Sequence, residues 1–216
     1  MTLVSTVWVL IGGSALLSVW FLLRYSWQGP SLAKTVIKTA SVAGLALAAL
    51  LVGGFTWLFA ALALAALGDF FLSRDGDRAF LAGLISFALA HLAYVVLMLG
   101  TGAPLSANLL TLLVAVVSVV MVLILFPRAG GLRWPVVGYV GIIAAMGMVA
   151  VSLPASFAIA MVAALFFMLS DMILGLERFV WGAANPLRRA APFVIWATYW
   201  LAQLLFLVAF ALERSL

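Results

Sequence analysis

The chain has 216 residues, of which 68% are apolar and only 8% are charged, and its net charge at neutral pH is +5. Soluble domains carry roughly 25% charged residues, so these charges are too few to cover a water-soluble globule. A cytosolic enzyme and a disordered chain are therefore both excluded. The sequence has no cysteine and a single histidine, His91. These counts exclude disulfide frameworks, cysteine nucleophiles and metal sites built on several histidines or cysteines.

The apolar residues form long runs that predict transmembrane helices. A helix needs about 20 mostly apolar residues to cross a hydrocarbon core of roughly 30 Å. Eight runs of this kind cover 3–23, 35–52, 55–73, 79–99, 107–126, 133–151, 155–176 and 190–212. The segments between them are short and rich in turn-forming residues. We therefore expect an all-α, polytopic bundle of eight transmembrane helices that forms one integral membrane domain over residues 1–216.

The basic residues predict the orientation of this bundle. Ten of the eleven Lys and Arg residues lie in or beside the segments that follow the first, third, fifth and seventh spans, and only Arg214 lies on the other side. Basic loops stay in the cytoplasm, so we expect a multipass protein of a plasma membrane, such as a bacterial inner membrane, with both termini outside. The positive charge is thus a topology signal, and no nucleic-acid partner is expected. The first span has no basic residues before it and is interpreted as a retained helix.

A weak internal repeat is visible in the sequence. Residues 67–72 (LGDFFL) are similar to residues 169–174 (LSDMIL), and residues 90–94 (AHLAY) are similar to residues 202–206 (AQLLF). Four spans separate the copies, which predicts two four-helix repeats of the same orientation, as in parallel transporter repeats. Chance similarity in a chain rich in Ala and Leu is the alternative explanation.

Two acidic residues, Asp69 and Asp171, lie inside apolar spans. An ionisable group within a span costs from about 2.5 kcal/mol upward and usually faces the bundle interior or a wet cavity. Each acid lies about one turn inside the cytoplasmic boundary of a span that runs in the same direction, so we expect the two to converge on one cavity. The alternative is that each caps a neighbouring helix or pairs with a loop arginine such as Arg74 or Arg178.

Other polar residues inside the spans are further candidates. His91 lies in the fourth span, and Tyr199 and Gln203 are four residues apart, on one face of the last span. Each of these could instead serve only as a hydrogen-bonding link between helices. Lys38, at the start of the second span, meets a phosphate or extends to the lipid headgroups. Residues 75–77 (DGD) lack the other ligands of a calcium loop and are interpreted as a solvated turn.

The chemistry left open is acid–base catalysis by two carboxyl groups, or transport. Zinc hydrolases need several histidines, and the sequence has neither a Ser–His hydrolase setting nor a phosphate-binding Gly-rich loop with Lys-Ser/Thr. We expect no metal and no cofactor. The sequence does not say which carboxyl group is the acid, nor does it give the oligomeric state.

Four motifs, taken in order, resemble the YhhN-like membrane family, whose characterised members are lysoplasmalogenases. They are Gly68-Asp69 with Leu72; Phe80, Gly83, Phe87, His91 and Tyr94; Phe167, Ser170, Asp171 and Leu174; and Thr198-Tyr199-Trp200 with Ala202-Gln203. The resemblance covers nearly the whole chain. The family often has Lys-Pro at the start of the second span, where this chain has Lys38-Thr39, and Lys34 competes with Lys38 for the corresponding role.

The resemblance implies hydrolysis of the vinyl ether bond of a lysoplasmalogen to a fatty aldehyde and glycerophospho-ethanolamine or -choline. It implies a catalytic role for Asp69 and Asp171 and a lipid and water as the partners. The residues expected to bind the substrate are His91, Tyr199, Gln203, Lys38, Ser170 and Tyr94. The alternative function is a small proton-coupled transporter or a lipid-binding membrane protein in which the two acids form a proton relay.

Overall fold

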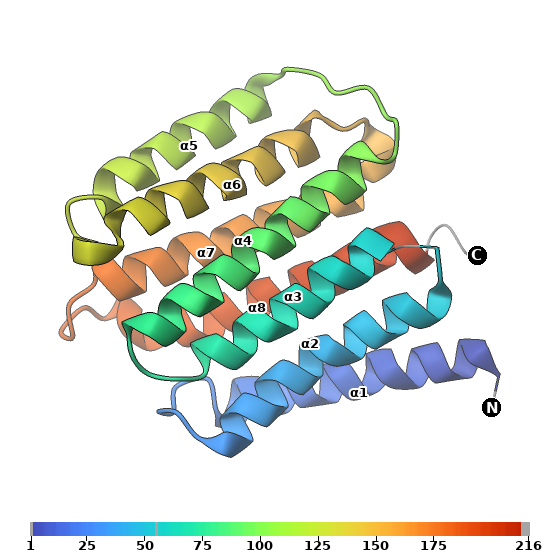
Figure 1. The fold of residues 1–216 in the computed structure, drawn as a ribbon, viewed down its shortest axis with the longest axis horizontal. Coiled ribbons are helices and arrows are strands. Elements are labelled where there is room, and N and C mark those ends of the chain that lie inside the picture. Colours follow the sequence, from blue (N-terminus) through green and yellow to red (C-terminus); the bar gives the residue numbers. More distant parts are fainter. Residues whose placement is uncertain (1, 55, 213–216) are drawn as a thin grey trace.

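The computed structural model of the chain describes residues 2–54 and 56–212, and this part folds into eight α-helices without a strand (Figure 1). The helices are α1 (Leu3–Arg24), α2 (Leu32–Val52), α3 (Thr56–Leu72), α4 (Asp77–Leu99), α5 (Leu109–Leu125), α6 (Arg133–Ser152), α7 (Ala158–Phe179) and α8 (Leu187–Leu207). Short 3₁₀ helices, η1 (Gly130–Leu132) and η2 (Ala155–Phe157), precede α6 and α7, and a π-helical turn, η3 (Val208–Leu212), follows α8. The predicted all-α class is confirmed.

Six of the helical segments are long and apolar enough to cross a membrane, so the chain is an integral membrane protein. The predicted spans 55–73 and 107–126 correspond to α3 and α5, which have only 17 residues each. At 1.5 Å per residue they are about 25 Å long, somewhat less than the hydrocarbon core. Eight helices are therefore confirmed, whereas eight complete membrane crossings stay a prediction.

Helix caps explain where the boundaries differ from the sequence-based prediction. The Ser31 side chain accepts a hydrogen bond from the Lys34 backbone N–H, so α2 begins at Leu32 and not at residue 35. Asn108 and Thr111 form a reciprocal capping box that starts α5 at Leu109. Both boundaries are fixed by side-chain hydrogen bonds to the backbone, which hydropathy does not detect.

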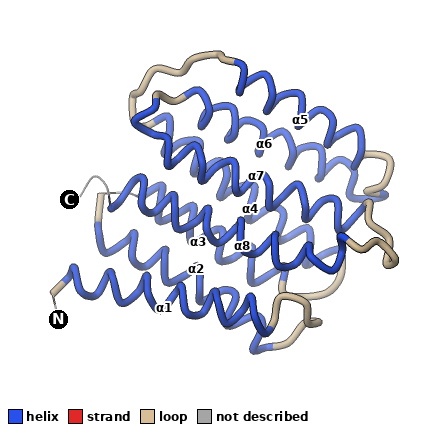
Figure 2. The backbone as a smooth tube through the Cα atoms, turned by 180° about the vertical axis from the view of Figure 1, so that it is seen from behind, coloured by secondary structure: helices blue, strands red, loops and turns tan. Residues whose placement is uncertain are grey.

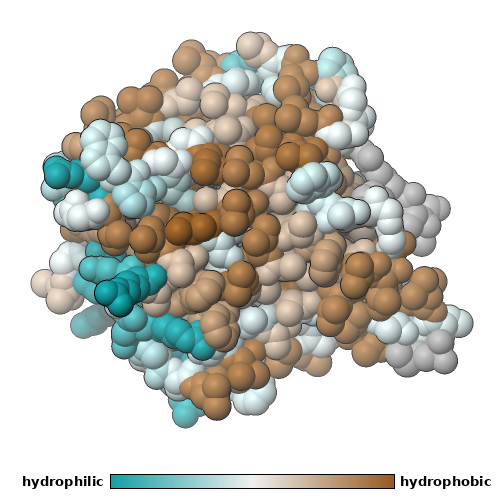
Figure 3. All heavy atoms as spheres, viewed as in Figure 1, coloured by the Kyte–Doolittle hydropathy of each residue, from teal (hydrophilic) through white to brown (hydrophobic). Residues whose placement is uncertain are grey.

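The helices form a tilted, antiparallel array in which α1 and α2 lie on one side and α5 and α6 on the other (Figures 1 and 2). The loops after α1, α3, α5 and α7 all lie at one end, opposite the start of α1 (Figure 1), and hydrophilic side chains gather at this end (Figure 3). We call it the basic end, because these loops and the adjoining turns carry nearly all of the Lys and Arg residues. The grouping of basic loops expected from the sequence is thus a property of the fold.

The two halves of the chain have matching contacts. Helix α4 packs on α6. Replacing each of these two helices by the one four places away along the chain gives α8 and α2, and these two helices also pack together. Tyr94 of α4 and Phe206 of α8, which occupy matching places in the predicted repeat, stack with ring centroids 3.8 Å apart. The internal duplication itself stays a prediction.

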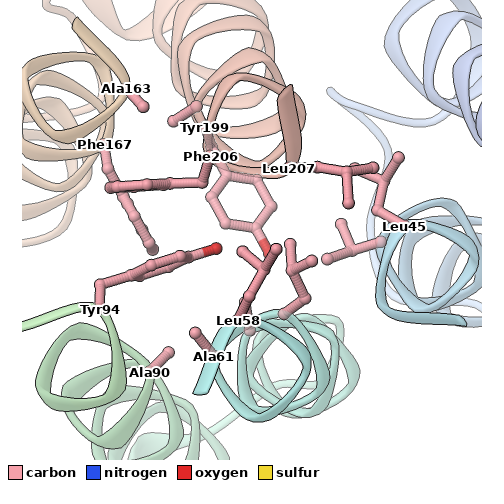
Figure 4. Close-up of a cluster of buried hydrophobic side chains, with 14 of the residues drawn as sticks. Leu45, Leu58, Ala61, Ala90, Tyr94, Ala163, Phe167, Tyr199, Phe206 and Leu207 are labelled. Carbon is pink, nitrogen blue, oxygen red and sulfur yellow. The ribbon is translucent and has the colours of Figure 1, made fainter. Parts of the chain in front are cut away.

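The buried core lies where α2, α3, α4, α7 and α8 meet (Figure 4). Large side chains such as Leu45, Leu58 and Phe167 are fully buried there, between small residues such as Ala90 and Ala163. Small residues let membrane helices approach closely, so the core is made of a few bulky side chains set among alanines.

Two glycines bring α3 and α4 into close contact. A Cβ at Gly68 would lie 2.6 Å from the Phe87 ring, and a Cβ at Gly83 would lie 2.7 Å from the Leu72 side chain. Both distances are too short for a real contact, so each position requires glycine as long as its neighbour stays in place. Gly68 also fixes the backbone next to Asp69, which connects this packing to the acidic residue.

We predict that Gly68→Ala destabilises the protein, because the added methyl group overpacks the Phe87 contact, and overpacking costs about 1–3 kcal/mol. Thermal unfolding in detergent, followed by circular dichroism, measures this effect. Gly141→Ala is the matched control, since nothing lies within 4 Å of a Cβ at that helical glycine. Equal midpoints for the two variants would contradict the close-packing argument.

Candidate functional site

A cavity of about 470 Å³ opens at the basic end, and both Asp69 and Asp171 line it. We call it the polar cavity. Its other charged lining residues are Lys34, Lys38, Arg74, Asp75, Glu177, Arg178 and Arg188. Its aromatic walls include Phe21, Phe80, Phe87, Trp196 and Tyr199. One space therefore holds two acids, several cations and an aromatic wall.

Asp69 has a polar partner at each carboxylate oxygen. The Lys38 ammonium lies 3.0 Å from Oδ1, and the Tyr199 hydroxyl donates a 2.7 Å hydrogen bond to Oδ2. The Asp69 side chain is only 1% exposed, so these two groups replace most of its contact with water. A buried ion pair of this kind is stable only while both partners are present.

Lys38 points into the polar cavity and is held against aromatic rings. Its Nζ lies 5.6 Å from the Trp196 ring centroid and 5.9 Å from the Phe21 ring centroid, both within the range of cation–π attraction. The Trp196 indole N–H in turn donates to the backbone oxygen of Ser18 at 3.1 Å. Lys34 donates instead to the Gln28 carbonyl in the α1–α2 loop. Lys38 is thus the lysine that meets an acid, and Lys34 lies nearer the loop.

Asp171 has a different set of partners. The Tyr139 hydroxyl donates to its Oδ2 at 3.1 Å, and His91 Nε2 lies 3.1 Å from the same oxygen. Helix α7 continues to Phe179, beyond the predicted boundary at residue 176. Asp171 therefore lies eight residues before the end of its helix, whereas Asp69 lies three residues before the end of α3. The expected depth of both acids relative to the membrane boundary stays a prediction.

The hydrogen bonding of His91 fixes the position of one ring proton. Nδ1 lies 2.6 Å from the Phe87 carbonyl oxygen, which can only accept, so we assign the proton of that contact to Nδ1. Nε2 then faces the Asp171 carboxyl group. The ring is fully buried and packs on Phe167 with centroids 4.2 Å apart.

The two acids thus differ in the charge of their neighbours. Asp69 lies against a lysine, whereas Asp171 lies against a histidine that can be neutral or charged.

The alternative expectation, in which the two acids pair with loop arginines, is not found in the structure. Arg74 donates to the Phe70 carbonyl, and Arg178 pairs with the exposed Asp77 at 2.7 Å.

The remaining candidates lie in two places. Ser170 lines the polar cavity, and its hydroxyl donates to the Ile195 carbonyl of α8 at 3.0 Å. Tyr94 and Gln203 form a separate, fully buried pair, in which the Tyr94 hydroxyl donates to Gln203 Oε1 at 2.7 Å. Neither of these two is among the described side chains that line the polar cavity. In the structure Tyr199 and His91 therefore contact the acids. Gln203 lies one helical turn after Tyr199 on α8 and contacts Tyr94 instead.

The sequence analysis missed Tyr139, Phe21 and Trp196. Tyr139 carried a usable signal, because a hydroxyl group inside an apolar span needs a polar partner, and an intramembrane acid is the strongest one available. Phe21 and Trp196 carried no such signal in the sequence. Aromatic residues are abundant along this chain, and only the fold shows which of them surround Lys38.

Within the described residues, no three His, Asp or Glu side chains lie close enough together to hold a metal ion. The groups gathered at the two acids are a lysine, a histidine and two tyrosine hydroxyls. This arrangement is suited to holding and moving protons.

The model of the YhhN family matches residues 33–210, which run from α2 to η3 and include both acids and their polar partners. The chain belongs to the YhhN family. The resemblance inferred from the four motifs is confirmed, and membership is consistent with a lysoplasmalogenase-like hydrolase of the membrane. Neither the curated proteins nor the solved structures gave a match to this chain.

We predict that Lys38→Met strongly destabilises the protein, because it leaves the Asp69 carboxylate buried without its cation. Breaking one side of a buried pair costs about 3–5 kcal/mol. The double variant Lys38→Met/Asp69→Asn removes both charges and recovers most of the lost stability in a detergent unfolding assay.

Arg178→Met serves as the control for this prediction. It breaks the exposed contact with Asp77, and an exposed pair is worth about 0–1 kcal/mol. A Lys38 variant no less stable than the Arg178 variant would show that the ion pair with Asp69 does not form.

Proposed function

We propose that this YhhN-family protein is a lysoplasmalogenase-like hydrolase that cleaves the vinyl ether bond of a lysophospholipid within the membrane. The observation that carries the proposal is that two carboxyl groups with unlike partners line one cavity. Family membership supports the same reaction class. The products are a fatty aldehyde and a glycerophospho-base.

The reaction requires one proton donor and one activated water molecule. Asp171 in its acid form protonates the β-carbon of the vinyl ether, which converts the C=C–O unit into an oxocarbenium ion. Water then adds to the carbon next to the ether oxygen and gives one proton to Asp69. The resulting hemiacetal then collapses: its C–O bond to glycerol breaks as Asp69 gives its proton to the glycerol oxygen, and the hemiacetal hydroxyl gives its proton to Asp171, so both carboxyl groups return to their starting forms. The sum is substrate plus water to aldehyde plus alcohol.

The partners of each acid support this assignment of roles. His91 Nε2 lies 3.1 Å from the Asp171 carboxyl group, so we assign to this pair the proton that the carbon receives. The Asp171 carboxylate left after protonation lies where positive charge develops and stabilises it. Asp69, whose charge Lys38 balances, lines the same cavity, and we assign it the role of the base that orients water and accepts its proton. The hydroxyls of Tyr139 and Tyr199 fix the two carboxyl groups.

The mouth of the polar cavity has the charges that a phospholipid headgroup requires. Lys34, Arg74 and Arg188 line it and provide donors for a phosphate. Glu177 and Asp75 line it as well and suit the ammonium group of an ethanolamine or choline. We assign Lys38 and Ser170 to the wall beside the reacting bond, and Tyr94 and Gln203 to joining α4 to α8.

We predict that Asp69→Asn and Asp171→Asn each lower aldehyde release by about 10²–10⁴-fold, the usual contribution of one general acid or base. The double variant is little slower than either single one, because residues that act as a unit are not additive. The assay is aldehyde formation from lysoplasmalogen by purified protein in detergent.

Asp77→Asn is the matched control, since Asp77 is exposed at the start of α4 and binds Arg178 away from the two acids. Full activity in either Asn variant of the pair would remove that residue from catalysis. A well-folded wild-type protein that releases no aldehyde would contradict the hydrolase and favour the proton-coupled transporter or lipid-binding protein.

We also propose that the basic end faces the cytoplasm and that both chain ends lie outside, because basic loops are retained inside. A reporter that fluoresces only in the cytoplasm stays dark when fused after Leu216, and one inserted in the α3–α4 loop is bright. The opposite pattern would move the mouth of the polar cavity to the outer leaflet.

A further inference from the structure

A second cavity, of about 290 Å³, lies between α5, α6 and α7. We call it the apolar groove, because Ser118, Tyr139 and Asp171 are the only polar side chains among the described residues that line it. It is thus a dry space with one of the two acids in its wall. The proposed reaction does not by itself account for it.

The apolar groove meets the polar cavity at Asp171. Three residues, Phe80, Asp171 and Leu174, line both spaces. A molecule that occupied both would have its polar part toward the basic end and its apolar part along α5 and α6. The atoms where the two parts join would lie beside the Asp171 carboxyl group.

The length of the apolar groove corresponds to one lipid chain. Beyond Asp171, on the side away from the basic end, its lining on α6 runs from Tyr139, which contacts Asp171, to Val151 near the other end of the helix. The twelve steps from Tyr139 to Val151 correspond to about 18 Å at 1.5 Å per residue. One leaflet of a hydrocarbon core roughly 30 Å thick is about 15 Å deep, so an aliphatic chain of ordinary membrane length fills the groove.

The apolar groove is open on the side where lipid lies. Four of its lining residues are exposed on the bundle surface, Leu110 (44%), Leu113 (48%) and Val117 (44%) on α5 and Leu165 (37%) on α7. Helix α5 lies at the edge of the array and packs mainly on α6 (Figure 1). A chain can therefore enter sideways between α5 and α7. A helix about 10–12 Å wide is too large for a space of this volume.

We propose that the apolar groove binds the single aliphatic chain of a lysolipid whose headgroup occupies the polar cavity. The chain enters from the bilayer between α5 and α7, and its first carbons stop at Asp171. The choice of a lysolipid rests on the proposed function, whereas the binding of a chain rests on the groove alone. The depth of the groove then limits the length of chain that is accepted.

Photocrosslinking with an ether lysophospholipid tests the binding directly. The probe has a saturated alkyl chain, which contains no vinyl ether and is not cleaved, and a diazirine at the chain end. After irradiation in detergent, mass spectrometry is expected to find the label on the α5 and α6 peptides that contain Leu110 and Val151.

Two substitutions block the apolar groove, and each has a neighbour as its control. Val117→Trp and Leu113→Trp place a ring in the opening, whereas Val116→Trp and Leu112→Trp put the same ring on exposed positions of α5 outside the groove. We expect labelling to fall about tenfold in the first pair, the effect of a small change in an apolar pocket, and to stay at the wild-type level in the second pair.

Hydrolysis of lysoplasmalogens of different chain length gives a second readout. In the first pair of variants, the rate ratio of short-chain to long-chain substrate rises about tenfold, and in the second pair it is unchanged. Equal labelling in all four variants, or label spread over α1 and α2, overturns the chain site. If the blocked variants lose the label but wild-type protein releases no aldehyde, the chain site stands and the proposed hydrolase fails.

Discussion

Two carboxyl groups buried in a helical membrane bundle need polar partners, and supplying those partners joins the two halves of the chain. Asp69 on α3 is held by Lys38 of α2 and Tyr199 of α8, while Asp171 on α7 is held by Tyr139 of α6 and His91 of α4. In each case one partner comes from the preceding helix and the other from the last helix of the opposite half. Neither half can complete its own acid, so the site exists only when the halves are assembled.

This arrangement explains why the acids and most of their setting could be predicted while their exact partners could not. An aspartate in an apolar run is visible in any sequence, and the cost of burying it implies a polar neighbour. The neighbour itself depends on helix rotation. The repeat pattern equated Gln203 with His91, but Tyr199, one turn earlier, is the residue that reaches the opposing acid. The residue that contacts the acid therefore differs by one helical turn between the two halves. This difference arises from how the helices pack, and no local sequence motif indicates it.

The same limit applies to the fold. Long apolar runs predicted eight helices because hydrophobic length is a property of the sequence alone. The tight α3–α4 contact was not predicted, since Gly68 and Gly83 gain their importance only from Phe87 and Leu72 opposite them. Cavities are less predictable still, because each depends on gaps between side chains from several helices. Asp171 was visible in the sequence, but its place between a wet space and a dry one was not.

Helix α1 lies entirely outside the residues that the family model matches, and yet it takes part in the site. Phe21 forms part of the aromatic surface beneath the Lys38 ammonium, and Ser18 anchors the Trp196 indole, which packs beside Phe21 in the same surface. A segment that looks peripheral by homology therefore holds the side chain that neutralises Asp69. Changes in α1 can therefore alter the surroundings of Asp69 without altering any residue of the shared motifs.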